Sequence, residues 1–211
     1  MRPDPDHEIR AFIAVPLDAP ARAAAARAVH ALRQVRAGDD VRWVREEALH
    51  VTLRFLGNVS PARIPDLVRH VRAETARVAP LHLKPGPVVS FPDARHPRVV
   101  ALVLEPEGAL ASLAAAVERG VVAAGFAPES RRFRAHCTLG RVKPRGRAPD
   151  VTAPVTVPDF TLDVTQAVLF RSDLNRDGAR YTPLEALPLA APGANDHPQM
   201  DVTSMGDEDE S

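Results

Sequence analysis

The chain has 211 residues, of which 45% are hydrophobic and 26% charged, a composition typical of a soluble globular protein with one large domain or two small lobes. A lone cysteine, Cys137, excludes an internal disulfide, and no apolar run approaches the roughly 20 residues of a membrane helix. The N-terminal segment lacks the apolar core of a secretory signal, so we expect a cytoplasmic protein.

The formal net charge of zero conceals an uneven distribution of charge. Residues 191–211 contain six acidic residues and no Lys or Arg, so residues 1–190 hold 27 basic and 21 acidic side chains, a surplus of six positive charges. A basic body suits an anionic partner such as a nucleic acid.

Hydrophobic periodicity and turn residues predict strands and helices that alternate along the chain, in an α/β (α+β) pattern. After a flexible leader at residues 1–8, we expect one domain over residues 9–189 and a disordered acidic tail at 190–211. Strands are expected at residues 9–17, 41–44, 49–56, 81–89, 98–104, 133–142, 160–170 and 180–187. Helices are expected at residues 19–37 (with Asp18 as N-cap), 60–78 and 109–124, and a Pro- and Arg-rich loop at 143–158.

Two short segments of the chain repeat one another. Leu49–Gly57 reads LHVTLRFLG and Ala135–Val142 reads AHCTLGRV, so each contains the pattern His-x-Thr-Leu. The two histidines are 86 residues apart, and a basic, aromatic segment precedes each motif. A single His-x-Thr on a strand usually serves packing or the surface, but the repetition indicates a duplicated unit that contributes one histidine from each half.

Alternation along a strand predicts where the motif side chains point. His50 and Thr52 should share one face of their strand, and His136 and Thr138 should share one face of theirs. Cys137 should point to the opposite face, which argues against a role as a nucleophile. Each motif therefore presents an imidazole beside a hydroxyl, backed by an apolar face that anchors the strand.

Two such pairs facing one another could cleave a phosphodiester. One neutral imidazole can accept a proton from water while the other, protonated, donates a proton to the leaving oxygen. Threonine hydroxyls can hydrogen-bond the non-bridging oxygens of the phosphate. We expect no metal and no cofactor, because no Cys pair, His-x-x-x-His pattern or acidic residue accompanies either motif.

Other residues near the motifs leave alternatives open. Arg141 could bind a phosphate through its guanidinium, although strict alternation would put it on the face opposite His136. Alternation puts Arg54 on the same face as His50 and Thr52, where it could also bind a phosphate, but it could equally be a solvated charge. Trp43 and Phe133 could stack a nucleobase or be buried in the core, and Phe91 is expected in the core.

With these residues in place, the sequence resembles the two-histidine phosphoesterase superfamily and, within it, the RNA 2',3'-cyclic phosphodiesterase family, also called the 2'-5' RNA ligase family. The segments that carry the resemblance run through most of residues 9–188 and read RAFIAV, RWVREEALHVTLRFLGNV, SFP followed by RVVALVL, RRFRAHCTLGRV and VLFRSDLNRDGARYTPL. The resemblance implies a bilobal fold of pseudo-twofold, duplicated lobes, with antiparallel or mixed sheets, helices outside and a central cleft.

The resemblance also implies roles for the motif residues. His50 would be the proton donor and His136 the proton acceptor, and Thr52, Thr138 and Arg141 would bind the phosphate. The implied reaction is metal-independent hydrolysis of an RNA-terminal 2',3'-cyclic phosphate to a 2'-phosphomonoester, with reverse 2'-5' ligation of RNA ends as a second activity.

Two other functions remain open from the sequence. The same catalytic pairs could act on a small cyclic nucleotide, a 2'-5' oligonucleotide or an ADP-ribose cyclic phosphate, or the chain could be an RNA-binding module without catalysis. The expected partners are RNA ends that carry a 2',3'-cyclic phosphate, tRNA fragments included. We expect a monomer with no membrane association and no obligate protein partner.

Overall fold

The computed structural model describes residues 8–35, 37–92, 97–144, 146–147, 156–175 and 178–191. The predicted leader and acidic tail lie almost wholly outside these residues, as does much of the predicted loop at 143–158. In the described part of the chain, no helix is long and apolar enough to cross a membrane.

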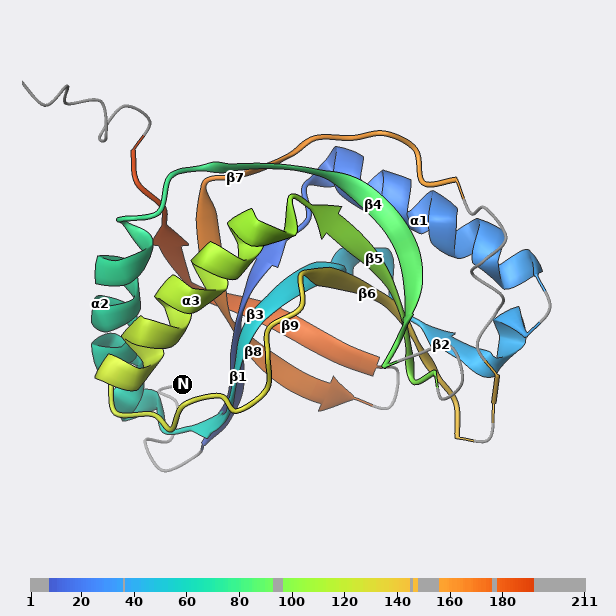
Figure 1. The fold of residues 1–211 in the computed structure, drawn as a ribbon. Helices are drawn as coiled ribbons and strands as arrows, with labels where there is room; N and C mark the ends of the chain where they lie inside the picture. The colour runs from blue at the N-terminus through green and yellow to red at the C-terminus, as the bar shows by residue number, and fades with distance from the viewer. Residues whose placement is uncertain are drawn as a thin grey trace, which may run out of the picture.

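Nine strands form one curled antiparallel sheet within the described residues (Figure 1). They are β1 (Ile9–Pro16), β2 (Val41–Trp43), β3 (His50–Val59), β4 (Leu81–Phe91), β5 (Val99–Glu105), β6 (His136–Val142), β7 (Leu162–Val164), β8 (Gln166–Asn175) and β9 (Gly178–Pro188). Every predicted strand is present. The predicted strand at 160–170 is two strands, because the chain bends at Thr165 and β7 pairs with β4 while β8 pairs with β1.

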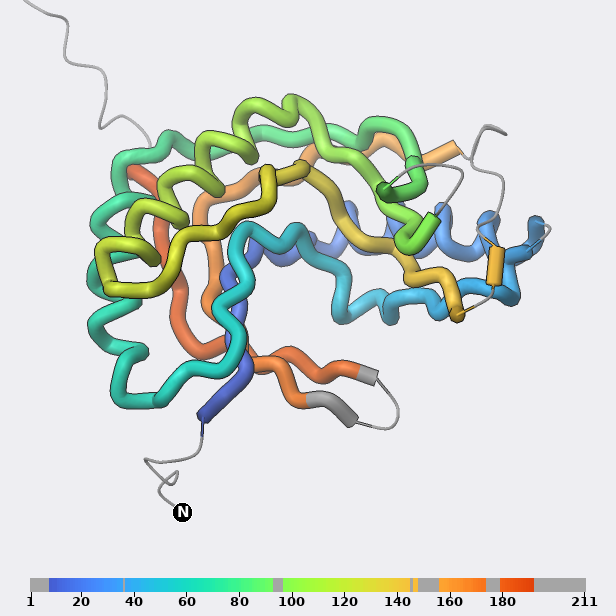
Figure 2. Tube along the Cα trace, turned by 60° about the horizontal axis from the view of Figure 1, so that its bottom comes forward, coloured from blue at the N-terminus to red at the C-terminus, as the bar shows by residue number. Residues whose placement is uncertain are grey.

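The sheet order places the two histidine motifs at its centre. The strands are arranged in the order β7-β4-β5-β6-β3-β1-β8-β9. Strand β2 pairs with residues 140–142 of β6, beyond the point where β6 pairs with β3. Strands β3 and β6, which carry the first and second motifs, are therefore neighbours, and each begins one half of the sheet (Figure 2). The predicted α+β class with two duplicated lobes is confirmed.

Three α-helices accompany the sheet in the described residues: α1 (Ala19–Gln34), α2 (Ile64–Thr75) and α3 (Glu107–Ala123). As predicted, the Asp18 carboxylate caps α1 by accepting a 2.9 Å hydrogen bond from the Ala21 backbone N–H. Helix α1 ends three residues earlier than predicted, and a short 3-10 helix, Gly38–Asp40, comes after it. Two further 3-10 helices, Glu46–Ala48 and Pro61–Arg63, precede β3 and α2.

Helices α2 and α3 pack side by side at one end of the molecule, and α1 lies at the other (Figure 1). The two helices approach closely at Gly120, where an added Cβ would lie 2.6 Å from the Val71 Cα atom. Gly125 follows Ala124, the C-cap of α3, with a φ of +79°, as expected for the glycine that ends a helix.

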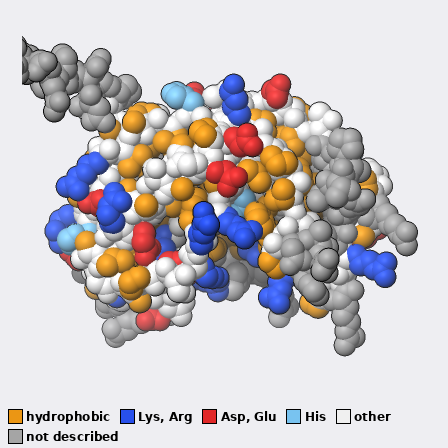
Figure 3. Space-filling model, in the orientation of Figure 1, with side chains coloured by type: hydrophobic (Ala, Val, Ile, Leu, Met, Phe, Trp, Pro, Cys, Tyr) orange, Lys and Arg blue, Asp and Glu red, His pale blue; other side chains and the backbone are white. Residues whose placement is uncertain are grey.

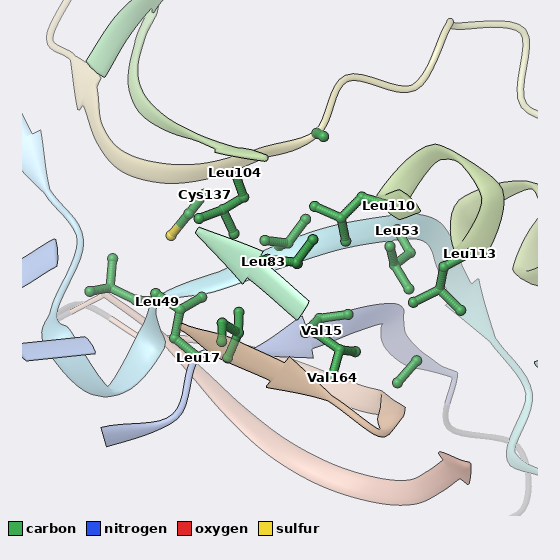
Figure 4. Packing of buried hydrophobic residues seen from close by; sticks show 14 of the residues in the cluster. Val15, Leu17, Leu49, Leu53, Leu83, Leu104, Leu110, Leu113, Cys137 and Val164 are labelled. Atoms are coloured by element: carbon green, nitrogen blue, oxygen red, sulfur yellow. The ribbon is translucent and has the colours of Figure 1, made fainter. Parts of the chain in front are cut away.

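A single apolar core fills the space between the sheet and the helices. Leucines and valines of strands from both halves contact leucines of α3, and Leu53 and Cys137 lie among them (Figure 4). The residues that alternate with the motif histidines are buried in this core. Each motif strand is therefore anchored by one face, and its other face points away from the core. We call the presented side, which carries His50, Thr52, His136 and Thr138, the motif face.

Candidate active site

The register between the two central strands brings the motifs together. Strands β3 and β6 pair at Val51 and Cys137, both fully buried. In an antiparallel pair the flanking residues lie opposite one another, so His50 faces Thr138 and Thr52 faces His136 across the strands. All four side chains project from the motif face, as the alternation predicted, and the two imidazoles are on different strands.

The same backbone contact orients both imidazoles. The Nδ1 atom of His50 lies 2.7 Å from the Ala48 carbonyl oxygen, and Nδ1 of His136 lies 2.8 Å from the Arg134 carbonyl oxygen. A carbonyl oxygen only accepts, so each Nδ1 carries a proton and donates it. In the neutral form of either histidine, Nε2 is therefore the basic atom that remains for chemistry. Sequence reasoning did not find these carbonyls, which stand two residues before each histidine.

The environment makes both imidazoles poorer bases than an exposed histidine. Burial is the main cause that lowers the pKa of His50 below 6.5, and the charge of Arg141 lowers it further. Burial likewise lowers the pKa of His136, with Arg141 and Arg134 adding to the effect, while the backbone carbonyl contact opposes it in both residues. Arg141 therefore lies within electrostatic reach of both histidines.

A β-bulge explains how Arg141 reaches the motif face. Residues Thr138 and Gly140 of β6 pair with the adjacent residues Ala101 and Val100 of β5, which leaves Leu139 as an extra residue between them. The extra residue shifts the alternation by one place. Arg141 pairs with Val99, which has the same parity as Ala101, so Arg141 shares a face with Thr138. The objection that strict alternation raises against Arg141 is thereby removed.

The first motif contains the equivalent bulge. Thr52 and Arg54 of β3 pair with Ala14 and Ile13 of β1, so Leu53 is the extra residue. After this bulge Phe55 pairs with Phe12 and lies on the motif face, where alternation alone would bury it. The two halves thus repeat in backbone detail, and Phe55 is the counterpart of Arg141.

Arg54 is neither a phosphate ligand nor a solvated charge. Its guanidinium donates a 2.6 Å hydrogen bond to Glu118 of α3 and 2.5 Å hydrogen bonds to the carbonyl oxygens of Phe55 and Ala127. The side chain is only 12% exposed. Arg54 therefore ties β3 to α3 and to the segment after α3.

The aromatic residues are distributed differently from the sequence expectation. Trp43 packs against Gly140 and donates a 3.0 Å hydrogen bond to the Gly38 carbonyl oxygen, and Phe133 packs against the core. The prediction for Phe91 was wrong: its partly exposed ring lies 4.9 Å from the His136 ring, between centroids. Phe91 pairs with Val99, which places it on the motif face.

Two further aromatic rings contact the first motif, and sequence reasoning missed both. The rings of Phe12 and Tyr181 lie 5.0 and 5.1 Å from the His50 ring, and Tyr181 meets it edge-on. Tyr181 is on β9, more than a hundred residues from His50, and only the pairing of β9 through β8 and β1 brings it there. No motif in the sequence signals this contact.

Cys137 lies outside the site, as predicted. Its side chain is fully buried on the core side, and burial raises the pKa of its thiol to about 12. Basic side chains, in contrast, gather beside a histidine near the middle of the face seen in Figure 3. Within the described ranges, no three His, Cys, Asp or Glu side chains come together as a metal site would require.

A curled antiparallel sheet with one His-x-Thr motif per lobe, meeting at adjacent central strands, defines a two-histidine phosphoesterase. The chain belongs to the 2'-5' RNA ligase superfamily, whose sequence profile matches residues 20–176.

Relatives in sequence and in structure agree with this membership. The chain is 32% identical to the RNA 2',3'-cyclic phosphodiesterase of Methanothermobacter thermautotrophicus over 86% of this chain and the whole of the relative. It is 30% identical to the protein of the same name from Geobacillus stearothermophilus, over 84% of this chain and 56% of the length of that relative.

Solved structures show the same fold. A Thermus thermophilus protein matches with a TM-score of 0.70 and 30% identity, covering 87% of this chain and all of that one. LigT of E. coli in its apo form matches with a TM-score of 0.68 and 26% identity, covering 88% of this chain and all of that one.

Proposed function

We propose that this protein hydrolyses RNA-terminal 2',3'-cyclic phosphates to 2'-phosphomonoesters without a metal ion. The observation that carries the proposal is the pair of imidazoles on adjacent strands, each with Nδ1 held by a backbone carbonyl and Nε2 left as the nitrogen for proton transfer, which in His50 contacts the Thr52 hydroxyl at 3.0 Å. The names of the relatives, RNA 2',3'-cyclic phosphodiesterase, support the choice of substrate. All proposed site residues come from one chain, which suits a monomeric enzyme acting on RNA ends.

In this proposal the two histidines exchange protons with the attacking and leaving oxygens. Nε2 of His136 accepts a proton from water as the water oxygen attacks phosphorus. The bond between phosphorus and O3' breaks, and His50 donates its Nε2 proton to O3'. The product carries the phosphate on O2', and solvent restores the starting protonation of both histidines. With the 5'-hydroxyl of a second RNA end in the place of water, the same groups in the same roles permit 2'-5' ligation: His136 takes the hydroxyl proton, the bond from phosphorus to O3' breaks and His50 protonates O3'.

The lowered pKa values of both histidines fit a site that is completed by its substrate. Without substrate, burial and Arg141 favour the neutral imidazoles, although the mechanism requires His50 to be protonated. A bound cyclic phosphate brings a negative charge between them, which opposes the effect of Arg141 and favours the protonated form of His50. Arg141, Thr52 and Thr138 would hold the non-bridging oxygens of that phosphate.

The test is hydrolysis of a short RNA that ends in a 2',3'-cyclic phosphate, in the presence of EDTA. We expect turnover by the wild type and a loss of about 10²- to 10⁴-fold in kcat for His50→Ala and for His136→Ala. His30→Ala, which removes an exposed histidine of α1, is the matched control and should keep full activity.

Each proposed feature can fail separately in this experiment. Absence of turnover by the wild type would rule out the proposed reaction, and loss of turnover only when EDTA is present would rule out its metal independence. Full activity of either motif variant would show that its histidine has another role.

A further inference from the structure

Arg134, whose carbonyl oxygen orients His136, also places its side chain beside that histidine. The guanidinium carbon of Arg134 lies 5.3 Å from the centre of the Phe91 ring, in a cation–π contact. The centre of the same ring lies 4.9 Å from the centre of the His136 ring. Phe91 therefore contacts both residues and holds the guanidinium near the proposed proton acceptor.

The charge of Arg134 is available to an anion from outside the protein. In the part of the chain that the structure describes, Arg134 is exposed and forms no ion pair. In contrast, Arg131 pairs with Glu129 at 3.1 Å, three residues earlier in the same segment. Contact with an aromatic ring does not use the N–H donors at the edge of a guanidinium, so these donors can still bind phosphate oxygens.

The first half of the molecule has no cation at the equivalent position. Ala48 stands there, and its carbonyl oxygen accepts Nδ1–H of His50 as the Arg134 carbonyl oxygen accepts that of His136. The electrostatics follow this difference. Arg134 is one of the charges that lower the pKa of His136, whereas the charges that act on the pKa of His50 are those of Arg141 and His136. One cation, Arg141, thus serves both histidines, and a second, Arg134, lies on the His136 side.

We propose that Arg134 binds a backbone phosphate of a second RNA strand, the strand whose 5'-hydroxyl takes the place of water in ligation. The inference rests on the proposed function, in which His136 accepts the proton of the attacking oxygen. In ligation, O5' of this strand attacks phosphorus and loses its proton to His136, the bond from phosphorus to O3' breaks, and His50 protonates O3'. The attacking strand must therefore approach on the His136 side, where Arg134 lies.

Water and an RNA strand differ in what they gain from this cation. Water is neutral, whereas the first nucleoside of the RNA strand carries a phosphodiester on its own O3', one nucleotide away from the attacking O5'. A guanidinium near the position of O5' can bind this phosphate by charge-assisted hydrogen bonds. Contacts to phosphate position a strand without reading its sequence. Arg134 should therefore favour ligation over hydrolysis for any strand with a 5'-hydroxyl end.

The size of the effect can be bounded from the exposure of Arg134. The contact should be worth more than an ion pair on an open surface and less than a buried charge-assisted hydrogen bond, which corresponds to about 3- to 30-fold in affinity for the 5'-hydroxyl strand. The phosphate is remote from the bonds that form and break, so its contact is the same in the bound strand and in the transition state. The loss should then fall on the KM of this strand rather than on kcat.

The test uses one RNA that ends in a 2',3'-cyclic phosphate and two RNA strands with a 5'-hydroxyl. The two strands differ only in the linkage after the first nucleoside, which is a phosphodiester in one and an uncharged methylphosphonate in the other. The measured quantity is the ratio of kcat/KM for ligation of the phosphodiester strand to kcat/KM for ligation of the methylphosphonate strand. The variant is Arg134→Gln. Arg132→Gln, which removes another exposed arginine of the same segment, is the matched control.

We expect the wild type to prefer the phosphodiester strand by about 3- to 30-fold, Arg134→Gln to lose this preference and Arg132→Gln to keep it. Any change in the basicity of His136 in Arg134→Gln affects both strands equally, so it leaves the ratio unaltered. Three results would overturn the proposal: no preference in the wild type, a preference that Arg134→Gln keeps, or an equal loss in Arg132→Gln.

Two further measurements separate failure of this proposal from failure of the proposed function. Hydrolysis of the cyclic phosphate without any ligated product would overturn the inference and leave the proposed hydrolysis intact. If the wild type yields neither product, the proposed reaction is wrong, and fluorescence anisotropy of the two labelled 5'-hydroxyl strands still gives their Kd values without turnover. A tighter Kd for the phosphodiester strand that Arg134→Gln weakens supports the phosphate contact, and a ratio of Kd values that the variant leaves unchanged refutes it.

Discussion

At the level of single residues, the two halves of the site use the same device to fix a proton. Each motif histidine donates Nδ1–H to the carbonyl oxygen two residues before it, Ala48 for His50 and Arg134 for His136. Thr52 adds a 3.0 Å hydrogen bond to Nε2 of His50. The tautomer is therefore set by the backbone just before each motif strand, and the chemistry depends on the charges around Nε2.

The charge of Arg141 should be measurable at both histidines. We expect Arg141→Gln to raise the pKa of His50 and of His136 toward 6.5, because removing the cation makes protonation of each ring less unfavourable. The measurement is an NMR titration of the histidine Cε1–H signals. Arg42→Gln, which removes the exposed arginine paired with Arg141 on β2, is the control and should give a smaller shift. Unchanged pKa values in Arg141→Gln would contradict the placement of its guanidinium near both rings.

Among the elements, the equivalent bulges in β3 and β6 mark the limit of what the sequence could predict. Alternation placed the motif histidines and threonines correctly, because the chain is regular as far as Thr52 and Thr138. It misplaced Phe55 and Arg141, because an extra residue depends on the register of the neighbouring strands β1 and β5. The positions of these two side chains could therefore be known only from the paired sheet.

The partners of Arg54 and the contact of Tyr181 with His50 could not be predicted from the sequence either, because they depend on contacts between distant segments of the chain. Glu118 and Ala127 lie 64 and 73 residues from Arg54, and neither pattern nor composition relates them to it. Helix and strand positions, in contrast, depend on local periodicity, and these were predicted to within a few residues.

Packing between α2 and α3 can be tested with one substitution at two positions of α3. We expect Gly120→Ala to destabilise the protein by about 1–3 kcal/mol, because the new Cβ would lie 2.6 Å from the backbone of Val71 and the helices must separate. Gly108→Ala is the matched control: its Cβ meets no atom within 4 Å, and alanine favours the helix. Urea unfolding of both variants measures the difference. Equal stability of the two variants would mean that the helices are not in contact at Gly120.

The molecule as a whole should lose stability in two steps as the pH falls. The pKa values of His50 and His136 are lowered by folding, so the unfolded chain binds protons first and stability decreases as the pH falls below about 6.5. Hydrogen bonds from Arg131 lower the pKa of Glu129 to about 2 from 4.5, so its contribution is complete above pH 4.5 and is lost as the pH falls toward 2.

Denaturant unfolding at a series of pH values measures both steps. We expect Glu129→Gln to flatten the dependence below pH 4.5 and leave the upper step, whereas His136→Gln should reduce the upper step and leave the lower one. An unaltered lower step in Glu129→Gln would assign the acid sensitivity to other carboxylates.

The sole thiol of the chain lies where the two halves of the molecule meet. Cys137 pairs with Val51 at the junction of β3 and β6, and its sulfur is closed off from solvent by the core (Figure 4). An alkylating reagent can therefore modify the native protein only when this junction opens. The rate at which Cys137 is alkylated, measured by mass spectrometry, therefore reports how often the junction between the two lobes opens, and no engineered probe is needed. A ligand that contacts both motifs should lower the alkylation rate of Cys137, and a ligand that binds a single lobe should leave this rate unchanged.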